Sequence, residues 1–407
     1  MSFPKLTIRD VPLDNKTVLI RADYNVPLSS DGKIDDDLRI RASLPTIQYL
    51  HDRGCKIVIM AHLGRPEGRD KALSLEPIGK HLAKLLDHPV LFVDDCKGDK
   101  VLQTVKKAPA HSIILLENLR YYAEEEADDL DFAKAIAAAT QAKYFVQDGF
   151  GVVHRAHAST HAITQVLPSV AGFLLEKEYV MITEAMEKPK RPLVAVIGGA
   201  KISDKIGIIE RFVDVADQII IGGAMANTFL KYKGYDMGAS KVESDQQAVL
   251  ERIYHKAHLK VGANTDDFML LPTDLAIAKT IDKTSHRHNI AVTALAANDI
   301  ALDIGDVSIE AAVKHINGAG TVIWNGTLGY AELAEFAHGS ARLALTLASQ
   351  SDTTSIIGGG DTADFVLKWD GNGGKSFSHV STGGGASLEL MSGLKLPGIE
   401  SLLKAYK

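Results

Sequence analysis

Residues 193–205, LVAVIGGAKISDK, decide the fold class of this 407-residue chain. The first five residues of this stretch are apolar and mostly β-branched, which favours a buried strand and is too short for a buried helix. The two glycines that come next allow a tight turn where the strand ends. A short buried strand leading into a glycine turn is typical of α/β proteins with a parallel sheet.

The same pattern extends in both directions along the chain. Short apolar runs alternate with helical patterns such as 73–86 and 128–139. The predicted strands are 18–21, 57–60, 90–93, 113–116, 144–146, 193–197, 218–221, 268–271, 322–324, 355–357 and 379–381. We therefore predict an α/β fold of doubly wound, Rossmann-like parallel sheets with helices on both faces.

Two lobes fit this number of strands better than one. A single sheet would contain about eleven strands, more than open sheets usually reach. A helical stretch over 173–187 follows Gly172 and ends before Pro189 and Pro192, which suits a helix that joins two sheets. We predict an N-terminal domain over 1–172, a linker helix or hinge over 173–192 and a C-terminal domain over 193–389. The packing of the remaining segment, 390–407, is left open.

The composition is that of a soluble globular protein, with 46% hydrophobic and 24% charged residues. A net charge of −6 gives no overall attraction to nucleic acid or to a membrane, so we expect small-molecule partners and a local anion site. The first residues lack a secretory pattern, and no apolar run is long enough to span a bilayer. Cys55 and Cys96 lie far apart, which favours reduced thiols. We therefore predict a cytoplasmic protein.

Cationic side chains follow four of the predicted strands in the first half of the chain. They are Arg21 after the first strand, His62 and Arg65 after the second, Arg120 after the fourth, and His154, Arg155 and His157 after the fifth, with Arg39 in a polar segment nearby. Ligands of open α/β sheets bind outside the carboxyl ends of the strands, and arginine suits carboxylate and phosphate. The pattern predicts a small polyanionic ligand. Arg21, close to Asp23, is explained equally well as an ion-pair partner.

Glycine runs follow the predicted strands of the second half, at 198–199, 222–223, 358–360 and 383–385. Such runs let backbone N–H groups approach a phosphate closely at the start of a helix. Asp361 lies inside the loop 358–362, where its carboxylate is compatible with a phosphate if Mg²⁺ lies between them. Lys201 and Lys205, four residues apart, are predicted on one helix face, where they can neutralise phosphate charge. A solvated helix face is the alternative, and it is stronger for Lys201.

Two other functional classes are compatible with parts of this pattern. A nicotinamide-dependent oxidoreductase would explain the glycine runs and the arginines, but it leaves Asp361 and Lys205 without a role. Residues 358–363 satisfy a relaxed dinucleotide fingerprint, yet no acidic residue ends a second strand about twenty residues later. A catalytically silent, two-lobed anion-binding protein is the third hypothesis. The absence of an export signal and the intact glycine runs count against it.

Taken together, these segments resemble the phosphoglycerate kinase family over essentially the whole chain. The matching stretches, in order, are VLIRADYNVP (18–27), HLGRP (62–66), LENLR (116–120), HRAH (154–157), GGAKISDK (198–205), GGGDT (358–362) and STGGGA (381–386). The resemblance implies reversible phosphoryl transfer between 1,3-bisphosphoglycerate and ADP, giving 3-phosphoglycerate and ATP, in glycolysis and gluconeogenesis. It further implies Mg²⁺, a monomer, and an active site in a cleft between lobes that close.

The resemblance also implies a role for particular residues. Those expected to bind the acid are Asp23, Asn25, Arg39, His62, Leu63, Gly64, Arg65, Arg120 and Arg155. Those expected to bind the nucleotide are Lys201, Lys205, Glu332, Gly358, Gly359, Gly360, Asp361 and Thr362, with Asp361 also on the metal. Arg39, Lys205 and Gly384 would act on the phosphoryl group in transfer. No general base is needed, because the carboxylate of the acid is ionised at neutral pH.

The sequence departs from the family pattern at two places. The family's W-N-G-P-x-G-V-F-E appears at 324–332 with Thr327 for proline and Tyr330-Ala331 for Val-Phe. The family's D-A-F-G-T appears at 148–152 as DGFGV. The first departure lies beside the expected nucleotide pocket and leaves the nucleotide preference open. The second concerns only the fine positioning of the acid.

Overall fold

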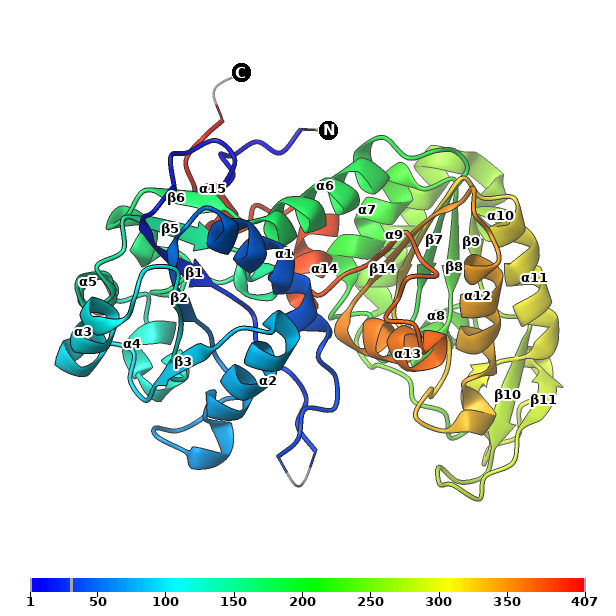
Figure 1. The fold of residues 1–407 in the computed structure, drawn as a ribbon. Helices are drawn as coiled ribbons and strands as arrows, with labels where there is room; N and C mark the ends of the chain where they lie inside the picture. The colour runs from blue at the N-terminus through cyan, green and yellow to red at the C-terminus, as the bar shows by residue number, and fades with distance from the viewer. Residues whose placement is uncertain (1, 30–31, 406–407) are drawn as a thin grey trace. The chain divides into compact units, whose positions relative to one another are not determined.

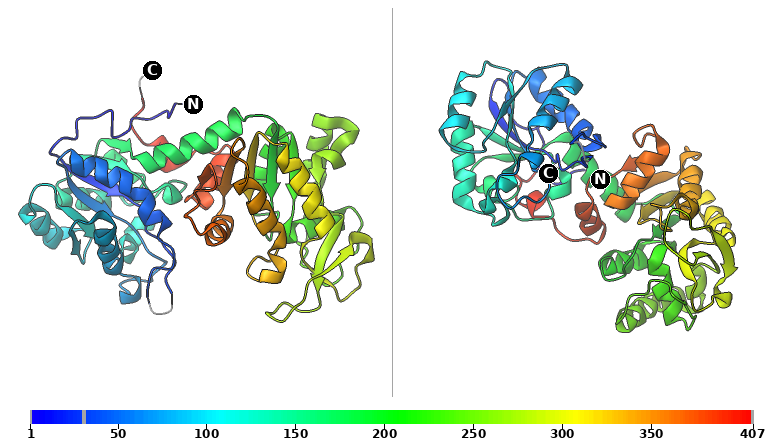
Figure 2. Two further views of the ribbon diagram at one scale, coloured as in Figure 1. Left: turned by 45° about the vertical axis from the view of Figure 1, so that its right-hand side comes forward. Right: turned by 90° about the horizontal axis from the view of Figure 1, so that it is seen from below.

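The computed structural model describes residues 2–29 and 32–405, which form two compact units. The first unit extends to Val180 and also takes the chain from Lys395 onward, and the second is Met181–Leu394. Each unit contains a six-stranded parallel sheet with helices on both faces (Figures 1 and 2). The predicted α/β fold of two parallel-sheet lobes is therefore confirmed.

The sheet of the first unit has the strand order β3-β4-β2-β1-β5-β6. Its strands are β1 (Thr17–Arg21), β2 (Lys56–Met60), β3 (Val90–Val93), β4 (Ile113–Leu116), β5 (Tyr144–Gln147) and β6 (Ser169–Ala171). The helices are α1 (Leu38–Asp52), α2 (Glu76–Leu86), α3 (Gly98–Lys107), α4 (Ala123–Glu126), α5 (Leu130–Thr140) and α15 (Pro397–Glu400), with short 3-10 helices η1 (Lys71–Leu73), η2 (Leu119–Tyr121), η3 (Phe150–Val152) and η4 (Ala162–Gln165).

Both faces of this sheet are buried, as the apolar runs require. In β1, Val18 and Ile20 pack into the core on one face, and Leu19 packs into the core on the other. Each side chain of this kind stabilises the fold by about 1.5–3 kcal/mol when it leaves water. The parallel register pairs Val18 with both Ile57 of β2 and Tyr144 of β5, so the carboxyl ends of these central strands lie at one edge.

The end of the chain packs on the first unit. The Leu6 N–H donates to the Leu403 carbonyl (2.8 Å), and the Leu403 N–H donates to the carbonyl of Ser169 in β6 (3.0 Å). The Gly398 N–H of α15 donates to the Val153 carbonyl (2.9 Å). These bonds answer the question that the sequence left open for this segment. β6 itself is a strand of three residues that the sequence pattern does not reveal.

The helix α6 (Phe173–Glu187) has the bounds predicted for the linker helix. The division between the two units falls inside it, between Val180 and Met181. Its use as a hinge stays a prediction.

The second unit has the strand order β15-β14-β13-β7-β8-β9. Its strands are β7 (Leu193–Ile197), β8 (Gln218–Ile221), β9 (Met269–Leu270), β13 (Thr321–Asn325), β14 (Thr354–Gly358) and β15 (His379–Val380). The helices are α7 (Ile206–Val215), α8 (Gly223–Tyr232), α9 (Gln247–Val261), α10 (Thr265–Phe268), α11 (Asp306–Asn317), α12 (His338–Ala348), α13 (Gly360–Asp370) and α14 (Gly385–Met391), with 3-10 helices η5 (Gly262–Asn264), η6 (Val292–Ala294) and η7 (Ala334–Phe336).

A further antiparallel sheet of three strands belongs to the second unit and is labelled in part in Figure 1. Its strands are β10 (Asp274–Ala278), β11 (His288–Ala291) and β12 (Ile300–Ile304), in the order β11-β10-β12. The sequence analysis did not predict it. Every predicted parallel strand is present, with ends that differ by at most one residue from those expected.

Candidate functional site

The loop after β1 carries the first group of predicted site residues. The Asp23 carboxylate is buried, accepts a hydrogen bond from the Asn25 N–H (3.1 Å) and faces Arg39 Nη1 at 3.3 Å. Arg39 Nη1 also donates to the Asn25 carbonyl (2.8 Å). The Asn25 side-chain oxygen accepts from the Gly64 N–H (2.8 Å). These four residues, predicted from three separate segments, are therefore linked by hydrogen bonds and an ion pair.

The loop after β2 is fixed by side chains from the segment that follows the neighbouring strand β4. Arg120 Nη1 donates to the Gly64 carbonyl (2.8 Å), and Arg120 Nε pairs with Glu126 (3.0 Å). The Asn118 amide donates to the Leu63 carbonyl (2.7 Å). Gly64 has a φ of +63°, a backbone conformation that favours glycine. Asn118 was quoted in the sequence motif without a role, and its role here is to position Leu63.

His62 is held by Arg21, whose role the sequence left open. Arg21 is buried, and its Nε donates to Ser159 Oγ (2.7 Å) while its Nη2 lies 3.2 Å from His62 Nδ1. A guanidinium can only donate, so His62 Nδ1 accepts and Nε2 carries the proton. Burial and then the charges of Arg21 and Arg120 hold the pKa of His62 well below its usual value. Arg21 therefore positions a neutral His62 with one N–H to donate.

The remaining positive groups of this edge are Arg65 and Arg155. Arg65 is exposed and makes no hydrogen bond or ion pair within the part of the chain that the structure describes. Arg155 Nε donates to His154 Nε2 (3.1 Å). Burial, followed by the charge of Arg155 for His154 and of Arg21 for His157, lowers the pKa of both histidines to about 4. Both are neutral at pH 7, so the positive charge of this edge comes from arginine.

In the second unit, Lys205 lies in a cradle of oxygen atoms. Its Nζ donates to Asn325 Oδ1 (2.6 Å), to the Gly198 carbonyl (3.0 Å) and to the Asn325 carbonyl (3.2 Å). A Cβ on Gly326 would lie 2.6 Å from this nitrogen, so the cradle requires glycine there. Burial lowers the pKa of Lys205 to about 8, against the opposing charges of Asp361 and Asp204.

The segment between the glycines and α7 is a turn, so the predicted helix face shared by Lys201 and Lys205 is wrong. The Glu243 carboxylate accepts hydrogen bonds from the Ile202 N–H (2.7 Å) and the Ser203 N–H (3.2 Å). These bonds occupy donors that a helix would use at its start, and α7 begins only at Ile206. Lys201 is exposed, and its ammonium makes no hydrogen bond to any described residue.

The glycine run after β14 opens α13 as predicted. Gly359 has a φ of +91°, and Gly360 is the first residue of the helix. Asp361 follows in the first turn, exposed, with no hydrogen-bond or ion-pair partner among the described residues. Thr362 is buried, and its Oγ1 accepts from the Gly326 N–H (2.7 Å), which joins this loop to the Lys205 cradle. Gly384, with a φ of +49°, precedes α14 in the same unit.

Asn325 is a site residue that the sequence analysis missed. It is 1% exposed, its Oδ1 accepts from Lys205, and its Nδ2 has no partner among the described residues. A Cβ on Gly359 would lie 3.2 Å from this Nδ2. A buried amide with two unsatisfied donors beside a glycine loop is suited to an anion. The W-N-G stretch at 324–326 was the available signal.

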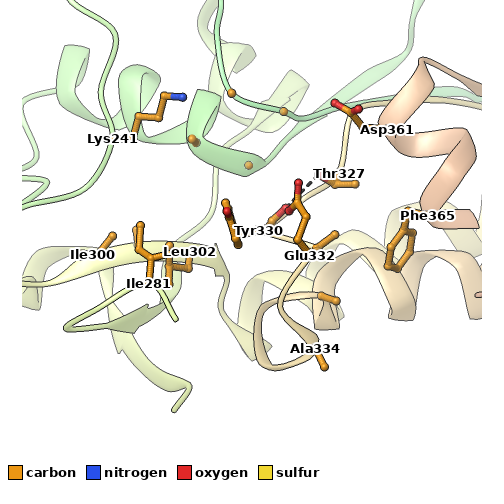
Figure 3. A pocket seen from close by; sticks show the side chains of 18 of the residues that line it. Lys241, Ile281, Ile300, Leu302, Thr327, Tyr330, Glu332, Ala334, Asp361 and Phe365 are labelled. Carbon is orange, nitrogen blue, oxygen red and sulfur yellow. Dashed lines mark hydrogen bonds between the residues drawn. The ribbon is translucent and has the colours of Figure 1, made fainter. Parts of the chain in front are cut away.

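A pocket of about 840 Å³ lies beside these loops, lined only by residues of the second unit. Figure 3 shows Asp361 toward one end and Lys241 toward the other, with Tyr330 and Glu332 between them. The volume is that of a site for a small organic ligand. Glu332 is exposed to the pocket, and its carboxylate makes no hydrogen bond or ion pair to a described residue.

A buried ion pair supports the loop that carries Tyr330. Arg287 Nη1 donates to Asp303 Oδ2 (2.9 Å), and both side chains are nearly inaccessible. The same carboxylate accepts from the Gly339 N–H (2.9 Å), and a Cβ on Gly329 would lie 2.4 Å from it. The Tyr330 N–H donates to the Leu302 carbonyl (2.7 Å). Residues far apart in sequence thus fix the pocket wall.

Comparison with known proteins agrees with this geometry. A family model described as phosphoglycerate kinase matches residues 8–394. The chain belongs to the phosphoglycerate kinase family. The family resemblance predicted from the motifs is therefore confirmed, and so is the predicted function of a phosphoglycerate kinase, a phosphotransferase with a carboxyl group as acceptor.

Individual phosphoglycerate kinases resemble the chain over almost its full length. It is 45% identical to that of Moorella thermoacetica, over 98% of this chain and 99% of the relative. It is 43% identical to that of Dictyoglomus turgidum, over 98% of both. The solved phosphoglycerate kinase structure from Coxiella burnetii gives a TM-score of 0.84 at 35% identity and covers 98% of each chain.

Phosphoglycerate kinases use ATP and ADP as co-substrates. Among residues 2–29 and 32–405, no three His, Cys, Asp or Glu side chains form a metal-binding group. Magnesium, however, is commonly held by one or two carboxylates together with substrate phosphates. The exposed, unpaired carboxylate of Asp361, at the start of a helix beside the glycine loop, fits that requirement. None of the described helices is both long and apolar enough to cross a membrane.

Proposed function

We propose that the first unit binds 3-phosphoglycerate or 1,3-bisphosphoglycerate and that the pocket of the second unit binds the nucleotide with one Mg²⁺. The observation that carries this assignment is the contrast between the two sheet edges. Arginines supply the positive charge at the sheet edge of the first unit, and a compact acid needs such side chains. Glycine loops lie at the sheet edge of the second unit together with Lys205 and Asn325, and their N–H groups suit a polyphosphate chain.

At the first edge, the guanidinium groups of Arg39, Arg65, Arg120 and Arg155 and the Nε2–H of His62 provide the donors for the acid. Asp23 and Asn25 act mainly by holding Arg39 and Gly64 in place. Because His62 stays neutral, it recognises the acid as a directed hydrogen-bond donor and leaves the bulk of the charge neutralisation to arginine.

At the second edge, the phosphates meet the N–H groups of the loop 358–362, the Nδ2 of Asn325 and the ammonium of Lys205. Lys201, exposed in the preceding turn, reaches the same phosphates from solvent. Glu332 accepts from the ribose hydroxyls. When bound, Mg²⁺ held by Asp361 offsets phosphate charge at the reacting end of the nucleotide.

Catalysis then consists of positioning and charge neutralisation. Arg39 from the first unit and Lys205 from the second neutralise the phosphoryl group during in-line transfer, and the backbone at Gly384 donates to it. The acid's carboxylate oxygen attacks without a base in the direction of ATP consumption. Lys205, with a pKa of about 8, keeps its positive charge at neutral pH.

The residues that bind the acid and those that bind the nucleotide belong to different units, so transfer requires the units to close on each other. Reacting atoms must approach within ~3–3.5 Å. We assign the hinge to α6, which spans the division between the units. Each set is complete within one chain, which supports a monomer, and the two buried, unbridged cysteines suit the cytoplasm.

Calorimetry on wild type and Asp361→Asn tests this assignment. The variant should bind 3-phosphoglycerate as wild type does, bind MgADP at least about tenfold more weakly, and lose most of its turnover. A matched variant, Asp267→Asn, changes an exposed carboxylate in the first turn of α10, outside the pocket, and should bind both ligands nearly normally. An equal loss of acid binding in Asp361→Asn would contradict the division of labour between the units.

A further inference from the structure

The short helix α4 of the first unit carries three consecutive glutamates, and only the middle one is buried. Glu124 is 46% exposed and pairs with Lys97 (3.6 Å), and Glu126 is 55% exposed. Glu125 is inaccessible, and burial raises the pKa of its carboxyl while the charge of Arg21 opposes that rise. A carboxylate is rarely buried without a positive partner, because its transfer out of water costs free energy. The groups around Glu125 must therefore account for its position.

Ser159 joins Glu125 to Arg21. The Ser159 Oγ donates to Glu125 Oε1 (2.5 Å), and the Ser159 N–H donates to Oε2 (3.0 Å). The same Oγ accepts from Arg21 Nε (2.7 Å), and Arg21 Nη2 lies 3.8 Å from Glu125 Oε1. Burial lowers the pKa of Arg21, and Glu125 opposes this effect more strongly than Asp23 does. Glu125 is therefore the main counter-charge of the buried guanidinium, and all three side chains interact away from solvent.

The guanidinium of Arg21 in turn decides which nitrogen of His62 carries a proton. It is fixed on a further side, because its Nη1 donates to the Ala22 carbonyl (2.5 Å) while Nη2 lies 3.2 Å from His62 Nδ1. With a donor against Nδ1, the proton of the neutral ring is on Nε2. If the guanidinium turned away, the Nδ1–H tautomer would become accessible. Nε2 would then present a lone pair, which repels an anion, in place of an N–H group.

We propose that Glu125 and Ser159 are positioning residues for the acid, because they hold Arg21 in the orientation that selects the Nε2–H tautomer of His62. Both side chains are buried, so they act through Arg21 and not by contact with the acid. The Glu125 carbonyl also accepts from the Ala158 N–H (2.9 Å), which fixes the segment in which Ser159 lies. The proposal rests on the proposed function only in placing 3-phosphoglycerate at this sheet edge.

The test combines long-range proton–nitrogen NMR of ring-labelled histidine with calorimetry of 3-phosphoglycerate and ADP, in wild type, Glu125→Gln and Ser159→Ala. The His62 signals are assigned by their loss in His62→Gln. Wild type should show the Nε2–H tautomer, and both variants should show a mixture of tautomers. Both variants should bind 3-phosphoglycerate about tenfold more weakly, because one hydrogen bond to the acid is lost. Binding of ADP, and kcat at saturating acid, should change little, since the lost contact is made throughout the reaction.

Glu124→Gln is the matched control, because it changes an exposed carboxylate of the same helix and should retain both the tautomer and the affinity. An Nδ1–H tautomer in wild type overturns the proposal without any variant. A wild-type tautomer in Glu125→Gln and Ser159→Ala overturns it too, even if the acid binds more weakly, because the loss would then come from packing alone. Full affinity for the acid despite a changed tautomer also contradicts it.

The proposed function can fail separately. Binding of 3-phosphoglycerate that is unaffected in His62→Gln would refute the assignment of the acid to this edge, and the tautomer would still report whether Glu125 orients His62.

Discussion

The two six-stranded sheets of this enzyme share an architecture and differ in the loops at the carboxyl ends of their strands. In the first unit charged side chains connect these loops through ion pairs, such as the one between Arg39 and Asp23. In the second unit they are rich in glycine, and their carbonyl groups accept hydrogen bonds from the half-buried Lys205. Under the proposed assignment, one fold recognises the acid by side chains at one edge and the nucleotide by backbone at the other, so the loops, and not the sheets, determine the ligand.

The largest effect is expected where the two regions act on the same phosphoryl group. Arg39→Ala and Lys205→Ala should each lower kcat by roughly 10²–10³, the usual cost of removing one group that stabilises charge in the transition state. Steady-state kinetics in both directions measure this. If Arg39→Ala alters only the KM for the acid, Arg39 belongs to binding alone and the proposed meeting of the two regions is incorrect.

A smaller effect, confined to one region, is expected at Arg155. It contacts His154 and is assigned to binding the acid throughout the reaction, so Arg155→Ala should raise the KM for 3-phosphoglycerate by roughly tenfold and leave kcat nearly unchanged. The KM for the nucleotide serves as the internal control. A matching fall in kcat would show that Arg155 interacts with the transition state as well.

Buried titratable groups of the first unit should make the stability of the protein depend on pH. His62, His154 and His157 of the first unit have lowered pKa values, so they stay neutral when folded and take up protons below about pH 6.5 when unfolded. Stability should therefore fall as the pH drops from 7 to 5. Asp148 opposes this trend, because burial raises its pKa to about 7 and the folded form holds a proton that the unfolded form releases above about pH 4.

Asp148→Asn removes that opposing contribution. The free energy of unfolding should then depend on pH more steeply than in wild type, by about 1.4 kcal/mol per pH unit between pH 5 and 6.5. Urea titrations at several pH values provide the measurement. An equal slope in the two proteins would mean that Asp148 is ionised in the folded enzyme.

The smallest change is expected in overall dimensions. Small-angle scattering should show a fall in the radius of gyration when 3-phosphoglycerate and MgATP are both present and little change with either alone. The reason is that only the two substrates together contact the binding residues of both units. Full compaction with a single substrate would show that closure does not depend on both regions.

The parallel strands were predictable because each is a short apolar run buried on both faces. The antiparallel sheet was not, since the edge strand β11 is mostly exposed and lacks a clear apolar pattern. The turn at Lys201 was also missed, because it depends on Glu243, about forty residues away. Motifs identified the charged groups, but the partners that fix them, such as Ser159 for Arg21, are set by tertiary contacts that no local pattern contains.

The return of the last residues to the first unit makes that unit discontinuous in sequence. The second unit, Met181–Leu394, is one uninterrupted segment and can complete its sheet before the residues that follow it are synthesised. The first unit completes its contacts only when Leu403 pairs with Leu6 and Ser169. A chain cut before Lys395 would therefore lose contacts in the unit whose other residues are synthesised first.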